Sequence, residues 1–108
     1  MPIYNDKGQV IGSINGDCLA KKIQGSKHFL RMPPAIAWDT KAVHEAQNAG
    51  ATFTRVVDEE TEIIYTTTIA ILWKHGIHIN RGHSPQIALP FKWWTELNPA
   101  QLQMFEEV

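Results

Sequence analysis

The sequence predicts an α+β domain in which a small, curved, mainly antiparallel sheet carries two or three short helices. Three observations lead to this prediction. Two pairs of strand-like segments each flank a tight turn. Two segments with helical spacing of small or apolar residues begin at a capping residue and end at a glycine. The elements follow one another as hairpin, helix, hairpin, helix, strand and helix, and a partly closed barrel is the alternative architecture.

The composition is that of an ordinary soluble globular protein, since 44% of the 108 residues are hydrophobic and 19% are charged. This length predicts a single domain over residues 1–108. Ten basic and eleven acidic residues give a formal net charge of -1, without the basic bias of most nucleic-acid-binding domains. Cys18 is the only cysteine, which excludes an intramolecular disulfide. No signal-peptide pattern or apolar run of membrane-spanning length is visible, so we expect a cytoplasmic protein without membrane association.

The first hairpin is predicted from residues 9–14 and 17–24, which flank the strong turn pair Asn15-Gly16. Before this hairpin, residues 3–4 form a short strand-like segment, and the turn-forming residues 5–8 connect the two. Gly12 lies inside the first strand, where glycine indicates a bulge or a close backbone approach, and an ordinary weak position is an equal alternative.

Residues 25–39 combine mixed polar and apolar side chains with an irregular backbone. Pro33 and Pro34 fix two φ angles and remove two amide donors, so no helix can pass through them and the segment is stiff and extended. Residues 35–39 follow as a short apolar strand that ends in the carboxylate of Asp39.

The first helix is predicted over residues 41–49, with Thr40 as its cap, Asp39 as the alternative cap, and Gly50 as its stop. Its narrow buried stripe consists of small residues that allow close packing on a sheet: Ala42, Val43, Ala46 and Ala49. His44 lies off this stripe and is expected to be solvated.

A second hairpin, residues 51–57 and 62–67, flanks the acidic turn 58–61, which we expect to be solvated rather than to bind a cation. A second helix is predicted over residues 69–75, capped by Thr67 or Thr68 and closed by Gly76. Its inward residues would be Ile69, Leu72 and Trp73. Extended segments at 77–79 and 86–89 flank a polar loop, and Asn98 and Pro99 begin a C-terminal helix that runs to about residue 107.

Two polar clusters are the candidate ligand-binding site. The first lies in the stretch 25–39 and the second in the loop 80–86, and a binding function requires the two to meet. The candidate residues are Ser26, Lys27, His28, Arg31 and Asp39 in the first cluster, and Arg81, His83 and Gln86 in the second. Lys21 and Lys22 extend the first cluster into a basic run beside Phe29 that can contact phosphates and stack a base, the alternative being a solvated face.

Metal-independent cleavage of a phosphodiester is the enzymatic alternative. His28 or His83 would act as acid and base, while nearby lysine and arginine side chains stabilise developing charge on the phosphate. No nucleophile elbow, glycine-rich phosphate loop or zinc-protease motif accompanies them. The spacing of His75, His78 and His83 fits no common zinc pattern, so we expect neither a metal nor a cofactor.

The adjacent tryptophans Trp93 and Trp94 indicate a possible interface. In an extended segment they point to opposite faces, so only one can enter the core easily. An exposed tryptophan is a common anchor in protein interfaces, which favours a homodimer or another protein partner. The alternative is that the C-terminal helix covers the second ring.

Residues 25–35, 80–83 and 86–90 resemble segments of small bacterial proteins carried on mobile elements such as integron cassettes. The resemblance extends over most of the chain after Gly12 and brings no catalytic residues. It implies a bacterial, cytoplasmic, self-contained accessory domain that can form a homodimer. Together the residues and the resemblance predict a small binding or interaction module rather than an enzyme.

Overall fold

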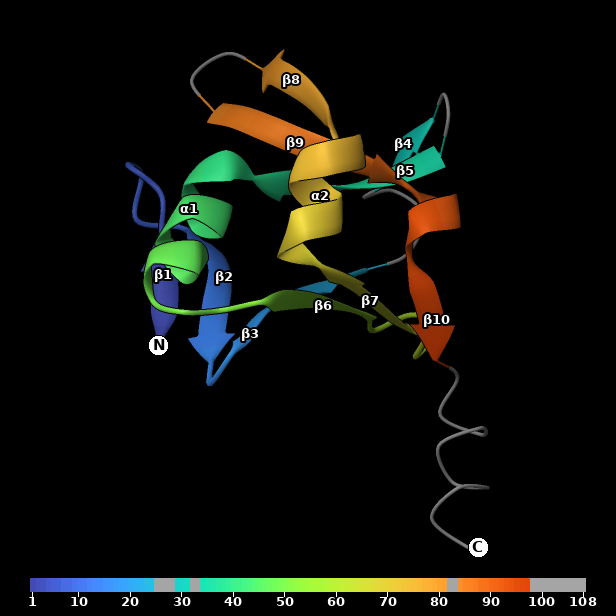
Figure 1. Cartoon of the computed structure of the whole chain (residues 1–108), viewed down its shortest axis with the longest axis horizontal. Coiled ribbons are helices and arrows are strands. Elements are labelled where there is room, and N and C mark those ends of the chain that lie inside the picture. Colours follow the sequence, from blue (N-terminus) through green and yellow to red (C-terminus); the bar gives the residue numbers. More distant parts are fainter. Residues whose placement is uncertain (25–28, 32–33, 82–83, 98–108) are drawn as a thin grey trace, which may run out of the picture.

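The computed structural model describes residues 1–24, 29–31, 34–81 and 84–97 (Figure 1). These residues form two β-sheets and two α-helices. The six-stranded sheet, sheet A, has the order β1 (Pro2–Tyr4), β2 (Val10–Asn15), β3 (Cys18–Ile23), β6 (Phe53–Asp58), β7 (Ile64–Thr68) and β10 (Thr95–Leu97). The four-stranded sheet, sheet B, has the order β4 (Phe29–Arg31), β5 (Pro34–Asp39), β9 (Ser84–Pro90) and β8 (Ile77–Arg81).

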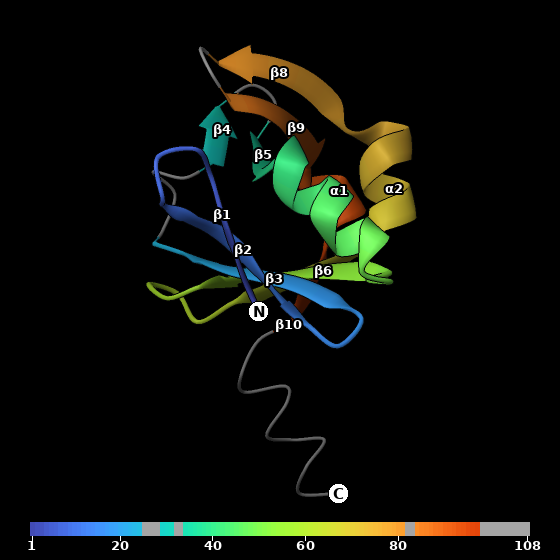
Figure 2. The same cartoon turned by 90° about the vertical axis from the view of Figure 1, so that its left-hand side faces the viewer.

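The predicted α+β class is confirmed, and pairing is mainly antiparallel with β3 and β6 as a parallel pair. The prediction of one curved sheet is wrong, because the described strands form two sheets and β5 pairs with β4 and β9 in the second. The two sheets lie on opposite sides of the core, and the helices α1 (Thr40–Asn48) and α2 (Ile69–His75) cover one side between them (Figure 2). The described strands form no closed barrel, so that alternative is not confirmed.

The first hairpin forms with its turn displaced by one residue. Asn15 pairs with Cys18, so Gly16 and Asp17 form the turn in place of the expected pair Asn15-Gly16. Gly16 has φ +63°, a conformation that glycine adopts without the steric cost of a Cβ atom. Gly12 shows both predicted features. Ile3 pairs with Gly12 while Tyr4 pairs with Val10, which leaves a bulge, and a Cβ on Gly12 would lie 3.0 Å from the Trp38 ring.

The helices begin where cap chemistry allows. Asp39, the alternative cap, is the N-cap of α1, since its carboxylate accepts a hydrogen bond of 3.0 Å from the Lys41 amide. Ala42, Val43 and Ala46 are buried as predicted, but Ala49 is exposed because it follows the last helical residue. Helix α2 has the predicted bounds, and the Thr68 hydroxyl accepts from the Ile71 amide at 3.1 Å.

Gly76 allows α2 to pack closely on sheet B. A Cβ at this position would lie 2.3 Å from the Leu72 carbonyl oxygen and 2.4 Å from Ile87 Cγ1. The backbone of Gly76 has an ordinary extended conformation, with φ -69° and ψ 149°. Glycine is therefore needed here for space rather than for backbone freedom.

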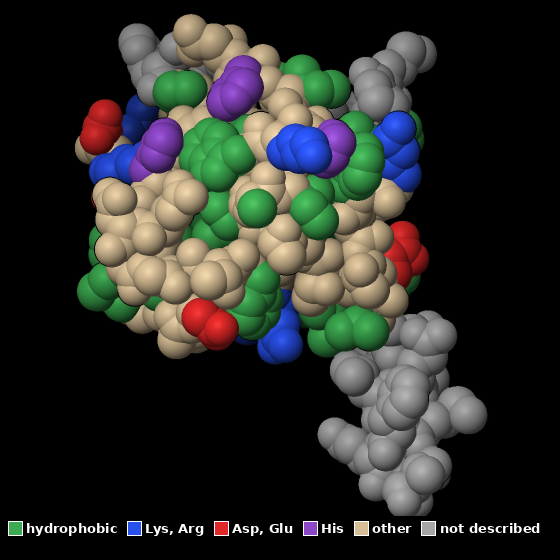
Figure 3. Space-filling model, viewed as in Figure 1, with side chains coloured by type: hydrophobic (Ala, Val, Ile, Leu, Met, Phe, Trp, Pro, Cys, Tyr) green, Lys and Arg blue, Asp and Glu red, His purple; other side chains and the backbone are tan. Residues whose placement is uncertain are grey.

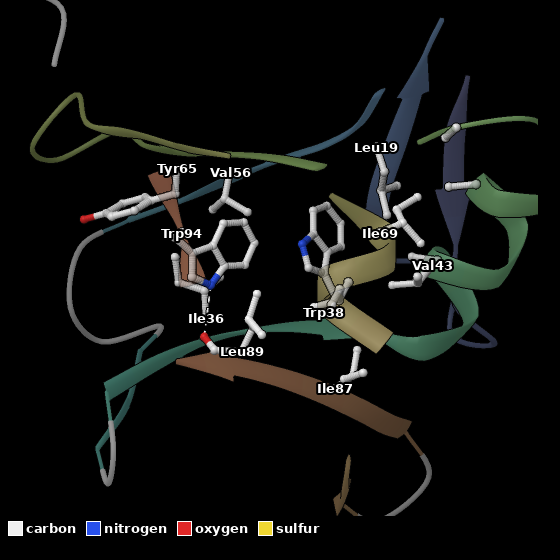
Figure 4. Close-up of a cluster of buried hydrophobic side chains, with 14 of the residues drawn as sticks. Leu19, Ile36, Trp38, Val43, Val56, Tyr65, Ile69, Ile87, Leu89 and Trp94 are labelled. Atoms are coloured by element: carbon white, nitrogen blue, oxygen red, sulfur yellow. Dashed lines mark hydrogen bonds between the residues drawn. The ribbon is translucent and has the colours of Figure 1, made fainter. Parts of the chain in front are cut away.

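The core lies between the sheets and the two helices (Figure 4). Trp38 of β5 lies at its centre with 0% exposure, surrounded by side chains from both sheets and both helices, including Leu19, Val43, Val56, Ile69 and Ile87. Trp73, which we expected inside, is half-buried and packs against the edge of the core. Asp58 of the acidic turn is also buried, and its carboxylate accepts from the Glu60 amide at 2.9 Å, so this turn is solvated only in part.

Two short elements after Pro90 were not expected. The 3₁₀ helix η2 (Phe91–Trp93) turns the chain away from sheet B, and β10 then pairs with β7 at the edge of sheet A. The predicted C-terminal helix lies outside the described residues. Among the helices that the structure describes, none has the length and apolar character to cross a bilayer.

Candidate functional site

A pocket opens where β2 and β3 separate. The two strands pair only over Ser13–Asn15 and Cys18–Ala20, although each continues beyond this short ladder. The resulting pocket has a volume of about 890 Å³, within the range of small-molecule sites. We call it the Lys21 pocket. It is lined by Asn5, Gln9–Ser13, Asn15, Ala20–Ile23, Ala37, Asp39, Val57, Ser84 and Gln86.

Lys21 occupies a position where an apolar residue is expected. Side chains alternate between the faces of a strand, and the neighbours Leu19 and Ile23 on the same face are both buried in the core. The Lys21 side chain reaches from sheet A to sheet B, where its ammonium donates a hydrogen bond to the Ala37 carbonyl oxygen. It also lies 4.5 Å from the centre of the Trp38 ring, in cation–π geometry. A cation is thereby held between the two sheets at the wall of the pocket.

Burial changes the acid–base chemistry of this amine. Removal from water lowers the pKa of Lys21 from 10.5 to about 8, and the Asp39 carboxylate opposes this shift. Lys21 is therefore mostly protonated at neutral pH and carries a substantial neutral fraction. A partly desolvated lysine can act as a cationic anchor or, when neutral, as a nucleophile.

Asp39 and Gln86 connect the pocket to sheet B. They pair directly in the antiparallel ladder of β5 and β9, and both line the pocket, as does Ser84. One carboxylate oxygen of Asp39 caps α1, which fixes the orientation of the side chain. The end of β5, where α1 begins, and the start of β9 thus meet at the Lys21 pocket.

The turn between β1 and β2 forms one wall of the pocket, and hydrogen bonds of its side-chain amides hold it in place. The Asn5 side-chain oxygen accepts hydrogen bonds from the amides of Lys7 and Gln9, each at 2.9 Å. The Asn5 amide nitrogen donates to the Gln9 side-chain oxygen at 2.9 Å. Val10 follows this turn and is 62% exposed beside the pocket. The entrance therefore combines hydrogen-bonding groups with uncovered apolar surface.

The described part of the structure brings together only two of the residues predicted for the site. Asp39 and Gln86 come together at the Lys21 pocket. Arg31 and Arg81 are described by their backbones alone, at strand positions opposite Pro34 and Ser84. Because Ala35 pairs with Pro90 while Asp39 pairs with Gln86, these two positions lie at opposite ends of sheet B (Figure 1). The remaining predicted residues lie outside the described part of the chain: Ser26, Lys27, His28 and His83.

Lys21 and Lys22 are adjacent in the predicted basic run, but their side chains lie in different environments. Lys21 faces the core side of β3, whereas Lys22 is exposed. The available signal was the alternation Leu19, Lys21, Ile23, in which a lysine replaces the middle apolar residue of a buried face.

One tryptophan of the pair is buried and the other only partly so, as predicted, although Trp93 lies in the 3₁₀ helix η2 and not in an extended segment. Trp94 enters the core, and its indole nitrogen donates to the Leu89 carbonyl oxygen at 3.0 Å. Trp93 is half-buried and stacks on His75, with ring centres 3.7 Å apart. The prediction that these tryptophans form an interface therefore rests on Trp93.

The histidines that the structure describes pack against aromatic rings. The ring centres of His44 and His78 lie 4.8 and 6.0 Å from that of Trp73. The indole nitrogen of Trp73 also donates a hydrogen bond of 3.1 Å to the side-chain oxygen of Gln47 in α1. Histidine side chains border hydrophobic surface on the face that carries both helices (Figure 3). Within residues 1–24, 29–31, 34–81 and 84–97, no three potential ligands gather into a metal site.

Cys18 is a poor candidate for a nucleophile. The thiol is buried, and this burial raises its pKa above the ordinary value, although Arg55 partly opposes the shift. In the described structure, the reactive group with access to a pocket is therefore the Lys21 amine rather than this thiol.

No protein-family model, curated protein or solved structure matches this chain. The functional argument therefore depends on the geometry of the Lys21 pocket.

Proposed function

We propose that this protein is a small-molecule-binding module whose ligand occupies the Lys21 pocket. The observation that supports the proposal is the position of Lys21 on the core-facing side of β3, beside a pocket of about 890 Å³. Burial of an amine without a use for its charge is unfavourable, so its retention beside a pocket favours a role in recognition.

The lining defines the chemistry of the ligand. Val10, Ile11, Ile23 and Val57 offer apolar surface, while two lysines and a single carboxylate give the lining a positive balance. A ligand with an aliphatic body and an electron-rich oxygen at one end would satisfy both features. Its oxygen would meet the Lys21 ammonium, and its body would cover apolar surface such as that of Val10.

Binding of straight-chain carboxylates tests this proposal. We expect hexanoate to raise the melting temperature more than butyrate or acetate at pH 7, because a longer chain buries more apolar surface. At ten times its dissociation constant, hexanoate should stabilise the fold by about 1.4 kcal/mol. The effect should weaken above pH 8, where Lys21 loses its charge.

Two variants make the test specific. Lys21→Met should abolish the stabilisation by hexanoate, measured against the same variant without ligand. Lys74→Met is the matched control, since Lys74 is exposed on α2 and does not line the pocket. Equal stabilisation of wild type and Lys21→Met, or no dependence on chain length, would contradict the proposal.

The phosphodiester-cleaving and nucleic-acid-binding alternatives depend on His28, His83 and the basic side chains near them. Most of these side chains lie outside the described part of the structure, and of the described members of the basic run Lys21 faces the core side of β3 while Lys22 is exposed. A homodimer and a cytoplasmic location stay predictions of the sequence.

A further inference from the structure

We propose that Lys21 forms a reversible imine with an aliphatic aldehyde bound in the Lys21 pocket. This inference rests on the proposed function, because the aldehyde would occupy the same pocket as the carboxylates. It adds a covalent step and a ligand class to the binding module.

Of the two lysines that line the pocket, Lys21 is the one whose amine is held in a fixed position between the sheets. Lys21 stands on the central part of sheet A, and its ammonium is held by the Ala37 carbonyl oxygen and the Trp38 ring of sheet B. The long side chain is therefore anchored at both ends. Because Lys21 Nζ is already positioned, its reaction with a carbonyl carbon bound in the pocket loses less entropy.

The protonation state agrees with this role. With its pKa lowered to about 8 by burial, roughly a tenth of Lys21 is neutral at pH 7. A lysine with the ordinary pKa of 10.5 would be roughly 300-fold less available as a nucleophile at the same pH. Exposed lysines of this chain therefore serve as internal references for the reactivity of Lys21.

The reaction balances without a further reactant. The neutral Nζ gives its electron pair to the carbonyl carbon, and the carbonyl oxygen takes up a proton to form a carbinolamine. Loss of the hydroxyl as water then leaves a carbon–nitrogen double bond, so amine and aldehyde yield imine and one water. When protonated, the imine carries the positive charge of the original ammonium, and the Asp39 carboxylate that interacts with Lys21 would stabilise it.

The pocket favours an aldehyde with an aliphatic chain. The side chains of Val10, Ile11, Ile23 and Val57 can cover such a chain, while Lys21 reacts at its end. The amide groups of Asn5 and Gln9 near the entrance suit an oxygen or water displaced from the carbonyl carbon.

Reductive trapping with hexanal is the decisive experiment. The purified protein is incubated with hexanal and cyanoborohydride at pH 7, and hexyl groups are located by peptide mass spectrometry. We expect Lys21 to be modified at least tenfold faster than Lys74, with a rate that rises with pH to a midpoint near 8. Excess hexanoate should suppress the modification of Lys21 and leave that of Lys74 unchanged.

A charge-conserving variant provides the control. Lys21→Arg should remove the fast modification and retain a native circular dichroism spectrum, with Lys74 still modified slowly. Comparable rates at Lys21 and Lys74, or no protection by hexanoate, would overturn the inference. If hexanoate binds in a Lys21-dependent way but Lys21 is not trapped, the inference fails and the proposed function stands. If hexanoate does not bind either, both fail.

Discussion

Lys21 shows how one residue can change the character of a strand. The positions of Leu19, Lys21 and Ile23 on one face of β3 would normally carry three apolar side chains that close the gap between the sheets. The lysine instead reaches across to β5 and leaves space beside it. A buried amine is costly even when it has a carbonyl and a ring as partners, so this position does not serve stability.

Replacement of Lys21 by Met should therefore stabilise the protein. The folded-state pKa of about 8 lies below the ordinary value of 10.5, so the unfolded chain binds more protons between these two pH values. The penalty is complete below pH 8 and disappears as the pH rises towards 10.5. Its upper limit is roughly 3 kcal/mol, from 1.36 kcal/mol for each unit of pKa.

Urea denaturation of wild type and Lys21→Met at several values between pH 7 and 10.5 checks this prediction. The variant should be more stable at pH 7, and the difference should shrink through the alkaline range. Taking the difference removes contributions from other titrating groups. A difference that does not change with pH would show that Lys21 carries no charge penalty in the folded state.

At the scale of elements, close approaches decide where helices and sheets can meet. Gly76 permits contact between the end of α2 and Ile87 of β9, and Gly12 permits contact between β2 and the Trp38 ring. The two sites differ in what surrounds the missing Cβ atom. Gly76 faces a backbone oxygen and a buried side chain, whereas Gly12 faces side-chain atoms at 3.0 and 3.1 Å.

We therefore expect Gly76→Ala to destabilise the protein by about 3 kcal/mol or more, and Gly12→Ala by about 1 kcal/mol. The Leu72 carbonyl oxygen cannot move without disturbing α2, while the neighbours of Gly12 can yield by small shifts. Thermal denaturation of the two variants tests the order of these effects. Equal losses would show that α2 adjusts its position on sheet B.

Local signals in the sequence predicted the elements well. The helix 69–75 has a threonine before it and a glycine after it, and its predicted bounds agree with α2. Both predicted hairpins form because each turn lies between two strand-like segments. Strand β10 was missed because three residues after a 3₁₀ helix carry almost no periodic signal.

The same local signals do not predict which strands distant in the sequence pair with each other. The apolar character of residues 35–39 predicts a strand but does not say that its partner is β9, and the division into two sheets depends on that pairing. For the same reason, the sequence placed Asp39 and Gln86 in the candidate site but could not show that Lys21 joins them. The separation of Arg31 and Arg81 also follows from register, which one sequence does not reveal.

At the scale of the whole molecule, the adjacent tryptophans have separate roles. Trp94 closes the core between the sheets, and Trp93 lies on His75 at the surface of α2. Trp94→Ala should lower the free energy of unfolding by about 3–5 kcal/mol because it empties a buried site.

Trp93→Ala should instead weaken the homodimer that the sequence predicts, with a smaller loss of stability. Sedimentation velocity of both variants over a range of concentrations separates the two effects. A monomeric wild type at high concentration, or an unchanged sedimentation coefficient in Trp93→Ala, would contradict the predicted interface.

The alternation of the two sheets along the chain has a consequence for how the protein is made. Strands β1 to β3 belong to sheet A, β4 and β5 to sheet B, β6 and β7 to sheet A again, and β8 and β9 to sheet B. During synthesis, β3 therefore leaves the ribosome well before its parallel partner β6, with β4, β5 and α1 emerging in between. Until then one edge of β3 is open to pairing with other chains, which exposes the half-synthesised protein to aggregation.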